Sequence, residues 1–340
     1  MEPLDFPVLQ DIEVSSLRPL SPEHTMCRSA PLLRRCRFRD ILSLPSLPSN
    51  LVVLDCEFST FVGDTFDLDP LLEFLPHVAH SLEHMRFGSP PWSEVHFTAR
   101  TSRIPLENLK SLLVRHSHEI MDHIHAPNLT YFASHSIKRE IGGMFDGFSA
   151  PNLQSIQFHR TPLRPFLATC DLPSMFPQLE SILLYDCPDE STFVPLLDPP
   201  KPAKPSSLKK APEYPPKDLK AGIPFPHLEE LTISDMGIWD SLQRTIEERL
   251  KNGDKSLRKI QLPNEEEIED FMEHPHQQFP PLGVELILYE HGELSRSPME
   301  FQDEFCDEED RLSSGISMED YYDLEDEALP ITPFDSPLYD

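Results

Sequence analysis

A short apolar pattern recurs ten times along the chain, and it restricts the fold more than any other feature of the sequence. Each copy has a leading leucine, two variable residues and an apolar residue, and in nine of the ten copies one more variable residue and a second apolar residue follow. The leading leucines are Leu9, Leu33, Leu51, Leu82, Leu109, Leu129, Leu153, Leu179, Leu228 and Leu257. A unit of this size cannot bury its own apolar side chains, so neighbouring copies must stack against one another.

The pattern within each copy predicts a short strand. If the leading leucine is position 1, apolar positions 4 and 6 alternate with variable ones, as in a strand that buries one face. Several copies begin with a proline, as in Ala150-Pro151-Asn152-Leu153 and Phe176-Pro177-Gln178-Leu179. We therefore predict an α/β fold over residues 1–290, an irregular leucine-rich-repeat solenoid of short parallel strands with helices or loops between them.

Helix signals fall between the predicted strands. Asp69 followed by Pro70 is expected to cap a helix that buries Leu71, Leu75 and Val78. A second helix is indicated by apolar residues at helical spacing, with Gly253 just beyond its end. These residues are Ile238, Leu242, Ile246 and Leu250. Val284, Leu286 and Leu288 are expected to form a last, capping strand.

Two segments interrupt the repeats. Residues 198–224 contain eight prolines and six lysines and are predicted to form a solvated loop inserted into one repeat. Residues 291–340 contain 16 acidic residues against two arginines, a net charge of −14, and are predicted to form a disordered acidic tail.

The charge of the chain excludes several classes of partner. Its 29 basic and 58 acidic residues give a net charge of −29, which is unsuited to nucleic acid or to an anionic membrane surface. The six cysteines are scattered without a Cys-x-x-Cys pair, which is typical of reduced thiols in the cytoplasm or nucleus.

The repeats resemble those of a known family. Phe176-Pro177-Gln178-Leu179-Glu180-Ser181-Ile182 and Phe225-Pro226-His227-Leu228-Glu229-Glu230-Leu231 are similar to the irregular leucine-rich repeats of fungal F-box proteins. In that family the repeats recognise the substrate, while an N-terminal F-box binds a Skp-type adaptor of a ubiquitin ligase. No F-box is recognisable before the first repeat, so we expect an adaptor as partner only if an F-box lies upstream. Of the family's asparagine or cysteine ladder, only Cys187 is evident.

Catalytic motifs are not found, and we expect neither an enzyme nor a bound cofactor. The sequence His118-Glu119-Ile120-Met121-Asp122-His123 approaches a zinc-protease helix. Its second histidine follows at five residues rather than four, so the two imidazoles would not face one metal ion. We interpret His116, His118, His123 and His125 as a solvated loop rather than a metal site.

The predicted register places positions 3, 5 and 7 of each repeat on the concave face of the sheet. Position 7 gives Arg115, His135, His159 and Tyr185 on four consecutive strands, and Tyr131 and Leu183 lie beside them at positions 3 and 5. Arginine and tyrosine are frequent interface anchors, so these six residues are the candidate binding site for a protein partner. An ordinary solvated strand face is the alternative.

The acidic tail contains candidate phosphorylation sites. Ser297, Thr332 and Ser336 each precede proline, and Ser317 precedes acidic residues. Our first hypothesis is a protein-recognition module resembling the substrate-binding repeats of an F-box receptor. The alternative is a ligase-independent repeat scaffold whose acidic tail binds basic partners.

Overall fold

The computed structural model describes residues 4–5, 8–15, 27–39, 50–58, 65–89, 94–98, 102–136, 148, 150–167, 171–198, 224–263 and 284–289. All of them belong to one compact unit, Met1–Glu290. Residues 199–223 of the predicted insert and all of the predicted tail lie outside the described residues.

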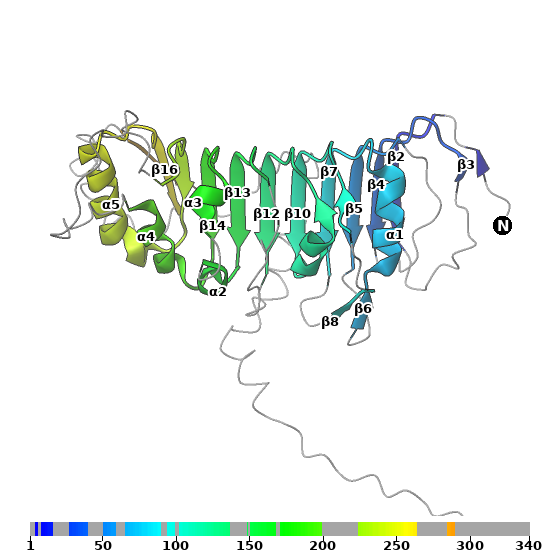
Figure 1. The fold of residues 1–340 in the computed structure, drawn as a ribbon, viewed down its shortest axis with the longest axis horizontal. Coiled ribbons are helices and arrows are strands. Elements are labelled where there is room, and N and C mark those ends of the chain that lie inside the picture. The colour runs from blue at the N-terminus through cyan, green and yellow to red at the C-terminus, as the bar shows by residue number, and fades with distance from the viewer. Residues whose placement is uncertain are drawn as a thin grey trace, which may run out of the picture. The chain divides into compact units, whose positions relative to one another are not determined.

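One long parallel sheet dominates the described part of the chain, as predicted (Figure 1). Its eleven strands lie side by side in sequence order. They are β2 (Asp11–Ser15), β4 (Arg35–Arg39), β5 (Val53–Glu57), β7 (His84–Gly88), β10 (Ser111–Arg115), β12 (Tyr131–His135), β13 (Ser155–His159), β14 (Ser181–Tyr185), β15 (Glu230–Thr232), β16 (Lys259–Pro263) and β17 (Glu285–Tyr289). The first ten each begin two residues after a leading leucine, which confirms the α/β class and the predicted strand register.

A proline turn precedes many of the strands, and Figure 1 shows these turns along one edge of the sheet. Six leading leucines donate their backbone N–H to the carbonyl oxygen three residues earlier, at 3.0 to 3.3 Å. They are Leu33, Leu109, Leu129, Leu153, Leu179 and Leu228. Proline stands at the second position in all of these turns except that of Leu109, because its fixed φ suits this position of a β-turn.

Each turn is hydrogen-bonded to the turn of the next repeat. The carbonyl oxygen of the residue after the leading leucine accepts two backbone N–H groups from the following repeat, at 2.7 to 3.2 Å. Nine residues do this: Gln10, Arg34, Val52, Glu83, Lys110, Thr130, Gln154, Glu180 and Glu229. The register of the sheet is therefore fixed before the strands begin.

Asparagine side chains reinforce this edge of the sheet. Asn108 donates to the carbonyl of His80 at 2.6 Å, and Asn128 donates to that of Glu107 at 2.8 Å. Asn50 makes the equivalent bond to Pro31 at 2.5 Å. This asparagine row lies before the strands, at a position that the sequence analysis did not consider.

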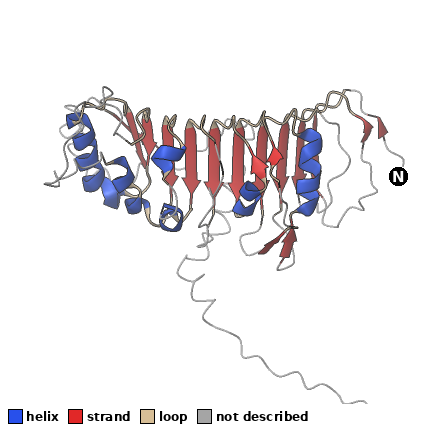
Figure 2. Ribbon diagram, viewed as in Figure 1, coloured by secondary structure: helices blue, strands red, loops and turns tan. Residues whose placement is uncertain are grey.

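The core lies on one face of the sheet, where the side chains at positions 4 and 6 point. From β4 to β14 these side chains are at most 1% exposed, as Phe38, Phe87 and Phe158 illustrate. The connecting segments close the core from the other side, and few of them are long helices (Figure 2). The helical elements are α1 (Asp69–Val78), α2 (Leu163–Leu167), α3 (Leu172–Met175), α4 (Val194–Leu197) and α5 (Trp239–Lys251), with the 3₁₀ helices η1 (His118–Asp122), η2 (Glu190–Thr192) and η3 (Met236–Ile238).

Both long helices were predicted, but the start of α1 differs from the prediction. Leu68 is the N-cap, and Asp69 is already helical. The Asp69 carboxylate accepts hydrogen bonds from the backbone N–H of Thr98, at 2.9 and 3.1 Å, instead of capping its own helix. The prediction of Asp69 as the cap was therefore wrong, because a residue distant in sequence competes for its carboxylate. Helix α5 ends as expected, with Gly253 at φ +84°.

Within the described residues, three small parallel pairs of strands lie outside the long sheet. They are β1 (Leu4–Asp5) with β3 (Cys27–Ser29), β6 (Thr65–Asp67) with β8 (Glu94–His96), and β9 (Ile104–Pro105) with β11 (Ile124–His125).

A buried arginine holds together the two sides of the predicted insert. Arg249 of α5 donates to the carbonyls of Leu197, Pro224 and Phe225, at 2.9 to 3.2 Å. It also forms an ion pair with Asp254 at 2.5 Å, and both side chains are almost fully buried. Burial lowers the pKa of Arg249, while Asp254 acts in the opposite direction.

We expect Arg249→Ala to lower the free energy of unfolding by about 3 to 5 kcal/mol, because Asp254 would remain as an uncompensated buried charge. The measurement is urea denaturation of the full chain. Arg244→Ala, on the exposed side of the same helix, is the matched control and should change stability by less than about 0.5 kcal/mol. Equal effects of the two substitutions would contradict this stabilising role of Arg249.

Candidate interaction surface

The predicted binding residues come together on the face of the sheet opposite the core. We call this the polar sheet face and define it as the side chains at positions 3, 5 and 7 of each repeat. The pairing of β10, β12, β13 and β14 sets Arg115 beside His135, His135 beside His159, and His159 beside Tyr185. The four position-7 side chains therefore form one row, here called the recognition row.

The rings of the recognition row contact one another. The centroids of His135 and His159 are 6.3 Å apart with an interplanar angle of 28°, and those of His159 and Tyr185 are 5.6 Å apart. His116, which follows Arg115, adds a ring 5.2 Å from that of His135. All four members of the row are partly exposed.

Two of the six predicted binding residues are less accessible. Tyr131 is 7% exposed and Leu183 is 5% exposed, so they support the row more than they offer surface. Ala133, at position 5 of the same strand as Tyr131, is also buried.

Burial keeps the two histidines of the row neutral. It lowers the pKa of His159 to about 4, with Arg160 acting in the same direction. The pKa of His135 is also well below its usual value, first because of burial and then because of His116 and Arg115. At neutral pH the row therefore presents uncharged rings. Arg160 is itself paired with Asp186 at 2.9 Å.

A network of ion pairs, which the sequence analysis did not identify, covers the polar sheet face from β2 to β7. At position 5 the charges alternate along Glu13, Arg37, Asp55 and Arg86. Their successive N–O distances are 3.6, 3.0 and 4.0 Å. The alternation is visible in the sequence once the repeats are aligned, and this signal could have revealed the network.

Arg115 is drawn toward this network. Its guanidinium lies 3.5 Å from the carboxylate of Glu57 on β5, with β7 between them. Burial raises the pKa of Glu57 to about 7, against the opposing effects of Arg86 and Arg115. The pKa of Asp55 is also raised by burial, while Arg86 and Arg37 act in the opposite direction.

Beyond the recognition row the chain turns sharply into the core. His116, Arg160 and Asp186 occupy position 8 with φ of 60°, 49° and 52°. The side chains at position 9 then bond back to the sheet. Thr161 donates to the carbonyls of His159 and Ser134 at 2.9 and 3.4 Å, and the Cys187 thiol donates to the equivalent carbonyls of Tyr185 and Phe158 at 3.6 and 3.3 Å.

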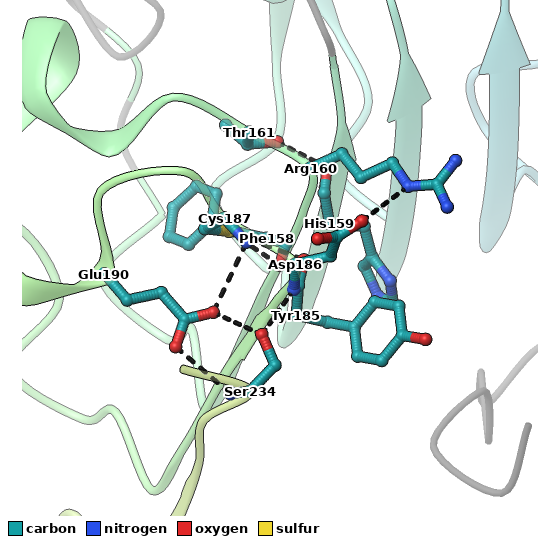
Figure 3. A network of polar contacts seen from close by, with 9 residues as sticks. All are labelled: Phe158, His159, Arg160, Thr161, Tyr185, Asp186, Cys187, Glu190 and Ser234. Carbon is teal, nitrogen blue, oxygen red and sulfur yellow. Dashed lines mark hydrogen bonds and ion pairs between the residues drawn. The ribbon is translucent and has the colours of Figure 1, made fainter. Parts of the chain in front are cut away.

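The prediction that only Cys187 belongs to a ladder was therefore incomplete. Thr161 occupies the same place in the previous repeat, because a hydroxyl can donate to the same pair of carbonyls as a thiol. Figure 3 shows both residues next to the recognition row.

A buried glutamate fixes the loop that follows Tyr185 (Figure 3). The Glu190 side chain is fully buried and accepts hydrogen bonds from the Ser234 hydroxyl at 2.6 Å and from the backbone N–H of Cys187 at 3.3 Å. Ser234 in turn accepts the backbone N–H of Asp186 at 2.6 Å. Burial raises the pKa of Glu190, and these hydrogen bonds act against that shift.

The histidine cluster is not the solvated loop that we expected. His116, His118 and His123 are buried, and only His125 is exposed. His118 Nε2 lies 2.7 Å from the hydroxyl of Ser134, a small polar residue in a core-facing position of β12. The buried hydroxyl thus gives the imidazole a polar partner inside the core.

The described part of the chain contains no group of three or more His, Cys, Asp or Glu side chains placed to hold a metal ion. Within the same ranges, no helix has the length and apolar character needed to cross a bilayer. The candidate phosphorylation sites Ser297, Ser317, Thr332 and Ser336 lie outside the described residues.

Comparison with known proteins adds no assignment, since neither a protein-family model nor a curated protein matches the chain.

Glu57 should make stability depend on pH in an unusual direction. Because its pKa is higher in the folded protein, its contribution is fully present below about pH 4.5 and is lost as the pH rises through 7. Relative to the wild type, Glu57→Gln should gain at most about 3 kcal/mol of unfolding free energy between pH 4.5 and pH 8. Urea denaturation at both pH values measures this, and a parallel pH dependence in the two proteins would contradict it.

His159 should act in the opposite sense. Its pKa is lower in the folded protein, so its contribution is lost as the pH falls from about 6.5 toward 4. Between pH 7 and pH 4.5 the wild type should lose about 2 kcal/mol that His159→Gln retains. His125→Gln, at an exposed histidine, is the matched control. If the wild type and both variants show the same pH dependence of stability, the lowered pKa of His159 is refuted.

Proposed function

We propose that the chain is a protein-recognition module, built as an irregular leucine-rich-repeat solenoid, and that its recognition row binds an extended segment of a protein partner. One observation carries the proposal: Arg115, His135, His159 and Tyr185 lie side by side on four adjacent parallel strands. A row at the strand spacing of about 4.8 Å presents side chains at regular intervals to an extended chain.

Three local features support the leucine-rich-repeat assignment. The leading leucines enter the core at each turn, the strands follow at a constant offset, and Thr161 and Cys187 form a ladder at position 9. In repeats of this kind each unit packs mainly against its neighbours, and insertions fall in the connecting segments.

The chemistry of the row suits contacts with planar or apolar side chains. His135 and His159 are neutral, and together with Tyr185 they present three adjacent rings. Aromatic rings supply large contact areas at low entropic cost, and such residues dominate the energetics of many interfaces.

By resemblance to fungal F-box proteins, the partner would be a substrate of a ubiquitin ligase. A Skp-type adaptor would join the complex only through an F-box outside this sequence. The alternative is a ligase-independent scaffold in which residues 291–340, with a net charge of −14, bind basic partners.

We expect Tyr185→Ala and His159→Ala each to weaken binding of a selected peptide by about tenfold, because each truncation removes one of the three adjacent rings of the row. The immobilised full chain selects peptides from a random library, and isothermal titration calorimetry then measures their affinities. Phe97→Ala removes an exposed aromatic side chain away from the long sheet and is the matched control.

Unchanged affinity for both row variants would refute the recognition row. If removal of residues 291–340 abolishes binding while the row variants bind normally, the scaffold alternative is favoured. Circular dichroism of each variant checks that the sheet is retained.

A further inference from the structure

Arg115 is paired across an intervening strand. β7 lies between β10 and β5 in the sheet, yet the guanidinium of Arg115 on β10 comes within 3.5 Å of the Glu57 carboxylate on β5. Both side chains are largely buried, with exposed fractions of 12% and 11%. The pair therefore spans the full width of β7.

The crossing passes over Gly88 of β7. This glycine is the register partner of both Glu57 and Arg115. A Cβ atom added at Gly88 would lie 3.4 Å from Arg115 Cβ and 3.7 Å from Arg115 Cδ. The aliphatic part of Arg115 thus runs over Gly88, at a distance where an added methyl group would be in van der Waals contact with it and a larger, branched side chain would collide with it.

On its other side, Arg115 has His135 as its register partner. Arg115 thus lies between Gly88 on one neighbouring strand and the ring-bearing His135 on the other. The ion pair with Glu57 holds the guanidinium on the Gly88 side.

We propose that Glu57 and Gly88 are positioning residues: Glu57 draws Arg115 back over β7, and Gly88 leaves the path of its side chain open. Protonation of Glu57 then releases Arg115 toward the rings of His135 and His159, where it binds a carboxylate of the partner. This inference rests on the proposed function for its partner, but not for the coupling between Glu57 and Arg115. The proton comes from solvent and stays on the Glu57 carboxyl group, so no other reactant is needed.

The charged groups around Glu57 are compatible with a change of protonation near neutral pH. Arg86 of β7, Arg115 of β10 and Arg39 of β4 favour the carboxylate, whereas burial and the neighbouring Asp55 favour the acid. Burial is the largest of these effects and places the pKa of Glu57 at about 7. Both protonation states are therefore populated in the neutral range.

The coupling can be tested without a partner. Nuclear magnetic resonance of the full chain, labelled at the glutamate carboxyl carbons and arginine nitrogens, follows Glu57 and Arg115 between pH 5.5 and pH 8.5. We expect both resonances to change with one midpoint near 7, and Arg115 to show no such transition in Glu57→Gln. If the Arg115 resonance does not change while Glu57 titrates, the inference is overturned.

The anion-binding step is tested with a fluorescein-labelled hexaglutamate peptide. Because the released fraction of Arg115 changes about tenfold between pH 8 and pH 6, the wild type should bind the probe up to about tenfold more tightly at pH 6. Glu57→Gln should bind at the tighter level at both pH values, and Arg115→Gln at the weaker level at both. Wild-type binding that is no stronger at pH 6 overturns this step.

Gly88→Val provides an independent variant, since a larger side chain blocks the path of Arg115. It should resemble Glu57→Gln, and the double variant should show no further change, because both act through one ion pair. Additive effects would show that Gly88 acts in some other way and would remove it from the inference.

The two proposals fail in different ways. If the Arg115 resonance follows the titration of Glu57, but selected peptides bind Tyr185→Ala and His159→Ala with unchanged affinity, the recognition function is wrong and the coupling is supported. If selected peptides need the row but Arg115 does not follow Glu57, the positioning role is wrong and the recognition function stands.

Discussion

The carbonyl group after each leading leucine joins consecutive repeats, and the rest of the structure depends on this contact. It accepts two N–H groups from the next turn, so each strand starts level with its neighbour. Level strands place every position 4 and 6 in one core and every position 7 in one row. A repeat that lost this contact would shift its strand, and a shift of one residue would exchange the core and polar faces.

Parallel, in-register stacking also explains the chemistry of the polar sheet face. Equivalent positions of successive repeats become nearest neighbours, so like charges must be avoided and unlike charges pair. Glu13, Arg37, Asp55 and Arg86 follow this rule along position 5. At position 7 of β12 to β14 the neighbours are rings instead, and burial keeps the histidines uncharged. The face therefore has a charged part and an aromatic part, and Arg115 lies at their boundary.

Several elements were accessible from sequence because their causes are local. The strands after the leading leucines and the end of α5 at Gly253 depend on neighbouring residues, and both were found where predicted. Other features depend on residues far apart in the chain. Asp69 does not cap α1 because its carboxylate accepts the backbone N–H of Thr98. His118 is buried, and its imidazole lies beside the hydroxyl of Ser134 in the core. The role of Thr161 was not predicted, because it depends on two carbonyl groups that come close to its hydroxyl only in the folded turn.

The sequence by itself determined the strand register and hence which residues line the recognition row, since a repeat period and a turn are short-range properties. Only the tertiary structure decided how those side chains pair. Glu57 and Arg115 belong to different repeats, and their contact passes over Gly88 on the strand between them. The same burial that brings them together sets the balance between their charged and neutral states. Burial of this kind arises from the stacked sheet and is not encoded in any single repeat.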